Sequence, residues 1–188
     1  MKEKLIEQSI LLFEKQGFNA TSIQDIVKKL NVTKGTFYYY FTSKEQLLME
    51  IHDDYITNLL DRQLKIISRS SLSQKEKLIE IIRLLIIDIQ DHGSSARVFF
   101  RELRHLSEGN VAAIKKVRRE FLENVKNVVQ EGINQGEFTN TLRGDMVAFG
   151  VVGITNWSYN WFNPDGDVTP EELARIYYQM ILHGILNE

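Results

Sequence analysis

The clearest structural pattern in this chain lies in residues 21–44, which read TSIQDIVKKLNVTKGTFYYYFTSK. Ser22 with Asp25 three positions later is a capping box that begins a short helix, and Thr33 can cap another short helix that ends near Phe41. A turn of about three or four residues joins two such helices in a helix-turn-helix, whose second helix can enter the major groove of DNA. The spacing therefore predicts this motif.

The same stretch is locally basic in a chain that is slightly acidic overall. Lys28, Lys29, Lys34 and Lys44 lie within residues 28–44, which contain no Asp or Glu. The whole chain has 23 Lys and Arg against 25 Asp and Glu, a net charge of -2. Because clustered cations attract nucleic acid whatever the net charge, this distribution favours a local DNA contact.

The start of the second short helix is unfavourable for a purely structural element. Lys34 in its first turn opposes the helix dipole by roughly 0.3–1 kcal/mol, and Gly35 inside the helix costs about 1 kcal/mol relative to alanine. A phosphate group bound at this helix end would explain both residues.

Phe37 and Phe41, four residues apart, predict the buried face of this helix. The opposite face, flanked by Tyr38, is expected to present Gly35, Thr36 and Tyr39. Hydroxyl groups on this face could donate to phosphates and contact base edges. The alternative is that the three tyrosines at 38–40 only cover the core, and the periodicity leaves both interpretations open.

The rest of the chain predicts an all-α fold. Apolar residues recur every three or four positions, no strand-like alternation occurs, and the two prolines, Pro164 and Pro170, fall in one loop. Further helices are predicted at about residues 3–16, from Ser43 onward, and at about 73–91, 95–106, 110–135, 145–161 and 171–186. We divide the chain into a DNA-binding domain, residues 1–47, and a ligand-binding and dimerisation domain, residues 48–188.

Composition narrows the function further. The chain has 188 residues, 43% of them hydrophobic, and no cysteine, which excludes disulfides and thiolate chemistry. No signal peptide or membrane-spanning run is visible, so we expect a cytoplasmic protein without a membrane partner. No nucleophile elbow, Walker loop or dinucleotide fingerprint occurs, and the histidines are scattered, so we expect no catalytic residue, metal or cofactor.

The motif resembles the N-terminal domain of the TetR family of bacterial transcriptional regulators. The resemblance covers residues 17–18, 21–26, 32–41 and 43–48, and it implies a homodimer that binds double-stranded operator DNA and has a variable C-terminal ligand-binding domain. Base or nearby backbone contacts are implied for Thr33, Lys34, Gly35, Thr36 and Tyr39. Phosphate contacts are implied for Thr21, Ser22, Tyr38 and Lys44. Tyr40 stands where the family often has histidine, and whether it contacts DNA stays open.

Two clusters in the larger domain are candidates for effector binding. Arg97, Arg101 and Arg104 fall near one helical stripe, where they could clamp an anion or pair with carboxylates such as Glu102. Aromatic side chains are dense in residues 156–162, which could line a pocket or form a dimer interface. TetR-like proteins pair their last two helices, so the resemblance implies a homodimer through these helices.

These clusters also loosely resemble the branch of the family that represses fatty-acid or sterol degradation genes and responds to acyl-CoA thioesters. That resemblance implies that Arg97, Arg101 and Arg104 bind CoA phosphates. It assigns the acyl tunnel to Phe99, Phe100, Leu103 and Trp157. The alternatives are an efflux-pump repressor that senses cationic or aromatic drugs and, more remotely, a small helical lipid carrier that does not bind DNA.

Overall fold

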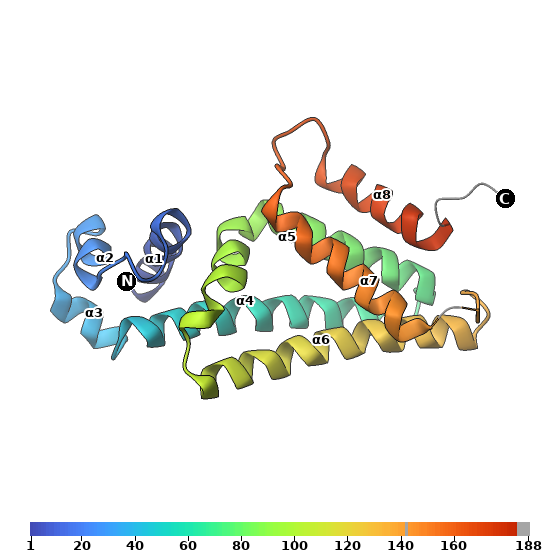
Figure 1. Cartoon of the computed structure of the whole chain (residues 1–188), viewed down its shortest axis with the longest axis horizontal. Helices are drawn as coiled ribbons and strands as arrows, with labels where there is room; N and C mark the ends of the chain where they lie inside the picture. Colours follow the sequence, from blue (N-terminus) through green and yellow to red (C-terminus); the bar gives the residue numbers. More distant parts are fainter. Residues whose placement is uncertain (142, 184–188) are drawn as a thin grey trace. The chain divides into compact units, whose positions relative to one another are not determined.

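The computed structural model describes residues 1–141 and 143–183, and within them the chain forms helices and no strand (Figure 1). The predicted all-α class is confirmed. The helices are α1 (Lys2–Gln16), α2 (Ile23–Lys29), α3 (Lys34–Tyr40), α4 (Lys44–Ile67), α5 (Gln74–Glu102), α6 (Glu108–Asn134), α7 (Gly144–Trp157) and α8 (Pro170–His183), with 3-10 turns η1 (Leu103–His105) and η2 (Ser158–Asn160). Residues 184–186 of the predicted last helix lie outside the described residues.

The helices pack into two compact units. The first unit comprises Met1–Thr57 and Ser94–Lys116, and the second comprises Asn58–Gly93 and Val117–Glu188. The helices α4, α5 and α6 each continue from one unit into the other. This division describes packing rather than function, so the functional boundary at residue 47 stays a prediction.

Local capping explains why the first three helices begin and end where they do. Gly17, at φ 84°, ends α1, and its N–H donates to the carbonyl of Phe13. Ser22 and Asp25 form the predicted capping box of α2. The hydroxyl of Thr33 accepts from the N–H of Thr36 at the start of α3. Such side chains satisfy N–H groups that have no partner inside the helix.

The structure differs from the predicted helices in two places. The segments predicted at about 73–91 and 95–106 are joined in α5, which bends at His92, where φ is −132° and ψ is 25°. The penultimate helix ends at Trp157 rather than near Trp161, because the chain tightens there into η2. In that turn the hydroxyl of Ser158 lies 2.8 Å from the Tyr177 hydroxyl.

Each unit has its own hydrophobic core. In the first unit the core includes Leu5, Phe13, Ile26, Phe37, Phe41 and Leu47, each at most 1% exposed. In the second it includes Ile81, Ile82, Val125, Ala148 and Val151, none of which is accessible to solvent. Burying a large apolar side chain stabilises a fold by about 1.5–3 kcal/mol, so these residues fix the units.

Candidate DNA-binding surface and effector pocket

The helix α3 presents an aromatic and basic face to solvent. Phe37 and Phe41 are 0% and 1% exposed, which confirms their predicted burial. Tyr39 and Tyr38 are instead 81% and 54% exposed, and Tyr40 is half-buried. Tyr38 and Tyr39 therefore do not serve only as a cover for the core.

Polar and basic residues surround the exposed tyrosines. Lys34 and Thr33 are exposed at the start of α3, and Thr36 is half-buried. The first turn of α3 has no acidic residue. A Cβ added at Gly35 would lie 3.4 Å from the Thr33 hydroxyl, an ordinary contact, so packing inside this chain does not require glycine there.

Two predicted phosphate contacts, Thr21 and Lys44, are engaged inside the fold. Thr21 is fully buried, and its hydroxyl donates to the carbonyl of Gly17 over 2.8 Å. The Lys44 ammonium donates to the carbonyls of Phe18 and Thr21, at 2.6 and 2.5 Å. Burial lowers the pKa of Lys44 below its usual value. These two side chains hold the turn between α1 and α2, which positions α2 and α3.

Ser22 is exposed, and its hydroxyl exchanges hydrogen bonds with Asp25. The hydroxyl donates to the Asp25 carboxylate over 2.6 Å and accepts from the Asp25 N–H over 3.1 Å. Hydrogen bonds from Ser22 hold the pKa of Asp25 below its usual value. The side chain is accessible, in contrast to that of Thr21.

The arginines predicted to bind CoA phosphates have different surroundings. Arg97 donates to the Glu14 carboxylate of α1 over 2.5 Å, within the first unit. Glu102, the expected carboxylate partner of the arginines, instead lies 3.2 Å from His105. Arg101 and Arg104 are exposed. Arg97 therefore joins α5 to α1.

The residues predicted for the acyl tunnel are divided between the two units. Phe99 is 1% exposed and packs against the rings of His52 and Tyr55, with centroids 5.3 and 4.9 Å away. Phe100 and Leu103 belong to the same unit. Trp157 belongs to the second unit and is 67% exposed on α7.

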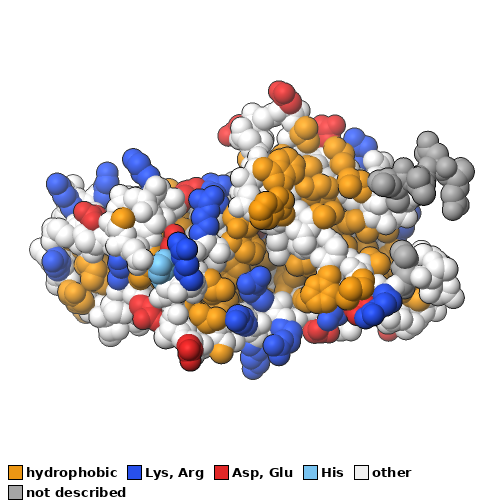
Figure 2. Space-filling model, viewed as in Figure 1, with side chains coloured by type: hydrophobic (Ala, Val, Ile, Leu, Met, Phe, Trp, Pro, Cys, Tyr) orange, Lys and Arg blue, Asp and Glu red, His pale blue; other side chains and the backbone are white. Residues whose placement is uncertain are grey.

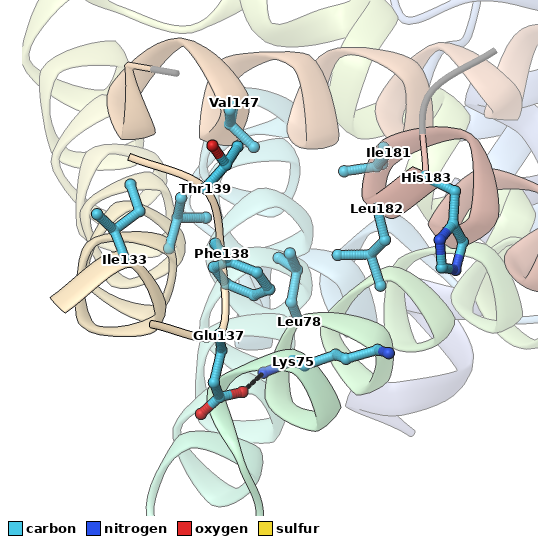
Figure 3. A pocket seen from close by; sticks show the side chains of 11 residues that line it. Lys75, Leu78, Ile133, Glu137, Phe138, Thr139, Val147, Ile181, Leu182 and His183 are labelled. Carbon is cyan, nitrogen blue, oxygen red and sulfur yellow. Dashed lines mark hydrogen bonds between the residues drawn. The ribbon is translucent and has the colours of Figure 1, made fainter. Parts of the chain in front are cut away.

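The second unit contains a cavity of about 300 Å³ that sequence reasoning did not identify. Its walls are mostly apolar, with Lys75, Glu137, Thr139 and His183 as the polar members. Figure 3 shows Phe138 and Leu78 near its middle, Ile133 on one side, Ile181 and Leu182 on the other, and Val147 at the top of the view. A mostly apolar lining of this kind suits the apolar part of a ligand.

The loop after α6 forms one wall of this cavity. A Cβ added at Gly132 would lie 2.2 Å from the Phe138 ring, so the ring rests directly on the glycine. The Glu137 carboxylate accepts from the N–H groups of Gln74 and Lys75, at 3.0 and 2.8 Å, at the start of α5 (Figure 3). These two contacts hold the loop in place.

The helix α7 exposes an apolar surface. Met146, Phe149 and Trp157 are 49%, 50% and 67% exposed. Nothing lies within 4 Å of a Cβ added at Gly150 or Gly153 on the same helix. Figure 2 shows hydrophobic side chains gathered over α7. Several large exposed apolar side chains on one helix favour an interaction site.

A helix-turn-helix with an exposed basic and aromatic second helix, together with a helical unit that encloses a cavity, defines a ligand-responsive transcriptional regulator. Residues 5–51 match the model of the bacterial regulatory proteins of the tetR family, and residues 71–185 match the tetracyclin repressor-like C-terminal domain. The chain belongs to the TetR family of bacterial transcriptional regulators. It is a regulator and not an enzyme.

Similar proteins extend along nearly the whole chain. The transcriptional repressor KstR2 of Rhodococcus jostii strain RHA1 is 25% identical over 186 residues, which cover 98% of this chain and 90% of KstR2. The TetR-family regulator PfmR from Thermus thermophilus is 27% identical, with a TM-score of 0.91 over 97% of this chain and 99% of PfmR.

AibR, solved in complex with isovaleryl coenzyme A and operator DNA, shares the fold at 22% identity. Its TM-score is 0.85, over 96% of this chain and 97% of AibR.

Among the described residues of this chain, no helix is both long and apolar enough to span a membrane.

Proposed function

We propose that this chain is a homodimeric repressor that binds a palindromic operator through α3 and releases it on binding a fatty acyl-CoA or a similar lipid thioester. The observation that supports the DNA contact best is the exposure of Tyr38 and Tyr39 next to the basic start of α3. Large aromatic side chains leave water when they bind a partner, and tyrosine hydroxyls donate to phosphates.

The proposed DNA-binding face is narrower than the sequence pattern predicts. It comprises Ser22, Thr33, Lys34, Gly35, Thr36, Tyr38 and Tyr39. Thr21 and Lys44 act as positioning residues, because their polar groups already bind the backbone between α1 and α2. Gly35 lets the DNA approach closely, which accounts for a glycine that internal packing does not require.

The proposed dimer forms through α7 and α8. The exposed Met146, Phe149 and Trp157 on α7, with Met180 on α8, supply the apolar area that a homodimer buries. The two open glycines of α7 allow close helix packing. A two-fold dimer places its recognition helices in successive major grooves, about 34–36 Å apart. The protein then acts in the cytoplasm, where its operator lies.

The proposed effector has an apolar acyl part, and the cavity beside Phe138 accommodates it. The walls are mostly aliphatic, and the same fold holds a CoA thioester in AibR. A cationic drug, the alternative effector, is disfavoured because both oxygens of Glu137, the carboxylate among the lining residues, already accept backbone N–H groups. Trp157, which belongs to the same unit as the cavity, stays a candidate for an outer contact with the effector.

The experiment is fluorescence anisotropy of labelled DNA from upstream of the gene, titrated with protein at fixed salt with and without a long-chain acyl-CoA. We expect specific binding that the thioester weakens at least about fivefold, the lower range of allosteric coupling. Free CoA and the free fatty acid serve as controls. Specific binding that no acyl-CoA weakens would reject the effector, and absence of specific binding would reject the DNA contact.

A further inference from the structure

We propose that the groove between α4 and α5 in the second unit binds the phosphate groups of a small phosphorylated ligand. The inference rests on the proposed function in one respect, namely that the ligand is the headgroup of the CoA thioester. The groove has a volume of about 270 Å³, and it is lined by Arg62, Lys65, Ile66, Arg69, Glu80, Arg83, Leu84 and Ile87.

The groove concentrates positive charge. Arg62, Lys65 and Arg69 recur every three or four residues on α4 and just beyond its end, and Arg83 lies across from them on α5. Glu80 is the carboxylate among the lining residues. The lining therefore has four cations and one anion, in a chain whose net charge is -2. The excess of cations over anions along one groove favours the binding of an anion.

One of the four cations is held in place from behind. The Arg62 guanidinium donates to the carboxylate of Asp88 over 2.5 Å, and Asp88 is only 3% exposed. A guanidinium has five N–H donors in a planar fork, so the contact with Asp88 leaves donors for a phosphate. Because its orientation is already fixed, Arg62 loses little conformational freedom on binding an anion.

The remaining cations are weakly neutralised. Arg83 lies 3.9 Å from Glu80, at the outer limit of an ion pair. Lys65 and Arg69 are exposed and form no ion pair with another described residue. Surface cations that lack a carboxylate partner can turn to a ligand without breaking a bond within the protein.

The groove also has apolar lining residues, which narrow the class of ligand. Ile66 and Leu84, which are 7% and 8% exposed, belong to the same lining as the cations. A lining that combines cations with apolar residues matches a molecule that joins phosphate groups to a flat or apolar body. The 3′-phosphorylated ADP part of coenzyme A has this chemistry.

The same carboxylate that holds Arg62 also contacts the bend of α5. The Nδ1 atom of His92 lies 2.9 Å from the Asp88 oxygen that accepts from Arg62. His92 is the residue at which α5 leaves helical geometry. An anion that binds Arg62 would therefore affect the hydrogen bonds of Asp88, which lie beside this bend.

The test is isothermal titration of the full-length protein with coenzyme A that has no acyl group. The variant is Lys65→Ala/Arg69→Ala, and the matched control is Lys115→Ala/Lys116→Ala, which removes two exposed lysines from α6. We expect the affinity for CoA to fall at least about tenfold in the groove variant, because charge-assisted hydrogen bonds are lost, and less than about twofold in the control. Inorganic pyrophosphate at millimolar concentration should compete with CoA for the wild-type protein and the control variant, but not for the groove variant.

Three results would overturn the proposal: no CoA binding to the wild-type protein, equal CoA affinity in the groove variant, or weaker operator binding by that variant without ligand. The last result would assign the groove to DNA. The effector proposal is tested separately. If an acyl-CoA releases operator equally from the groove variant and the control variant, acyl-CoA remains the proposed effector, and the groove is rejected as its phosphate-binding site. If CoA binds in the groove but acyl-CoA does not release operator, acyl-CoA is rejected as the effector, and the groove remains a phosphate-binding site.

Discussion

The ammonium group of Lys44 donates to two backbone carbonyls and lies 4.2 Å from the centre of the Phe18 ring. The resemblance to the family implies a phosphate contact for Lys44. The sequence pattern gives no sign that its ammonium group is engaged inside the fold. Thr21 is similar, since its hydroxyl already donates to Gly17. At the scale of single residues, the pattern predicts which segment faces DNA, but it does not show which side chains already bind other groups of the protein.

Lys44→Met should lower the free energy of unfolding by roughly 1–3 kcal/mol, because two carbonyls lose a charged donor. Chemical denaturation followed by circular dichroism measures this change. The control is Lys29→Met, which removes an exposed lysine of α2 and should leave stability nearly unchanged. Equal stability of the two variants would contradict the positioning role.

Lys34→Ala should weaken operator binding while the protein keeps its fold. Each phosphate contact contributes about −0.9 to the slope of log K against log salt, so the slope should become shallower by about that amount. Anisotropy titrations at several salt concentrations give the slope, and Lys115→Ala is the control. An unchanged slope would remove Lys34 from the contacts.

Among the elements, the short N-terminal helices are the ones that sequence reasoning places best. Gly17, Ser22 and Thr33 act on groups within four residues, so their effect can be deduced from the local pattern. The cavity could not be deduced in this way. Its wall depends on Glu137 reaching N–H groups 62 and 63 residues away, which no periodicity encodes.

The contact between Gly132 and Phe138 predicts that Gly132→Ala changes the stability of the protein in opposite directions with and without the Phe138 ring. Gly132→Ala should destabilise the protein by about 1–3 kcal/mol, because the new methyl group displaces the Phe138 ring. In a Phe138→Ala background, the same change should instead stabilise by up to about 1 kcal/mol, because alanine favours the helix. Thermal denaturation of the four proteins measures both effects. The same sign in both backgrounds would show that the ring does not rest on Gly132.

For the whole molecule, α5 is the helix that contributes to the cavity, to the groove and to the contact with α1. Its first part borders the cavity and the groove, and its part after His92 contains Arg97, which binds Glu14 of α1. The partner of Arg97 lies 83 residues away in the chain, so the sequence pattern does not predict that Arg97 binds Glu14. We infer that α5 connects effector binding with the DNA-binding segment.

The proposed dimer predicts that Phe149→Glu yields a monomer. The glutamate would place a charge in a buried apolar interface, which is strongly unfavourable without a partner. Sedimentation velocity should show the mass of one chain, and operator affinity should fall because a monomer contacts one half-site. Val168→Glu, at an exposed loop position, is the control and should stay dimeric. A dimeric Phe149→Glu protein would place the interface elsewhere.

A repressor that acyl-CoA controls must couple operator binding and effector binding reciprocally. If acyl-CoA weakens operator binding by some factor, operator must weaken acyl-CoA binding by the same factor. The measurement is the affinity for acyl-CoA, by isothermal titration, with and without a saturating operator duplex. We predict a loss of affinity equal to the factor found by anisotropy. The same affinity for acyl-CoA with and without operator would contradict a repressor that this ligand controls.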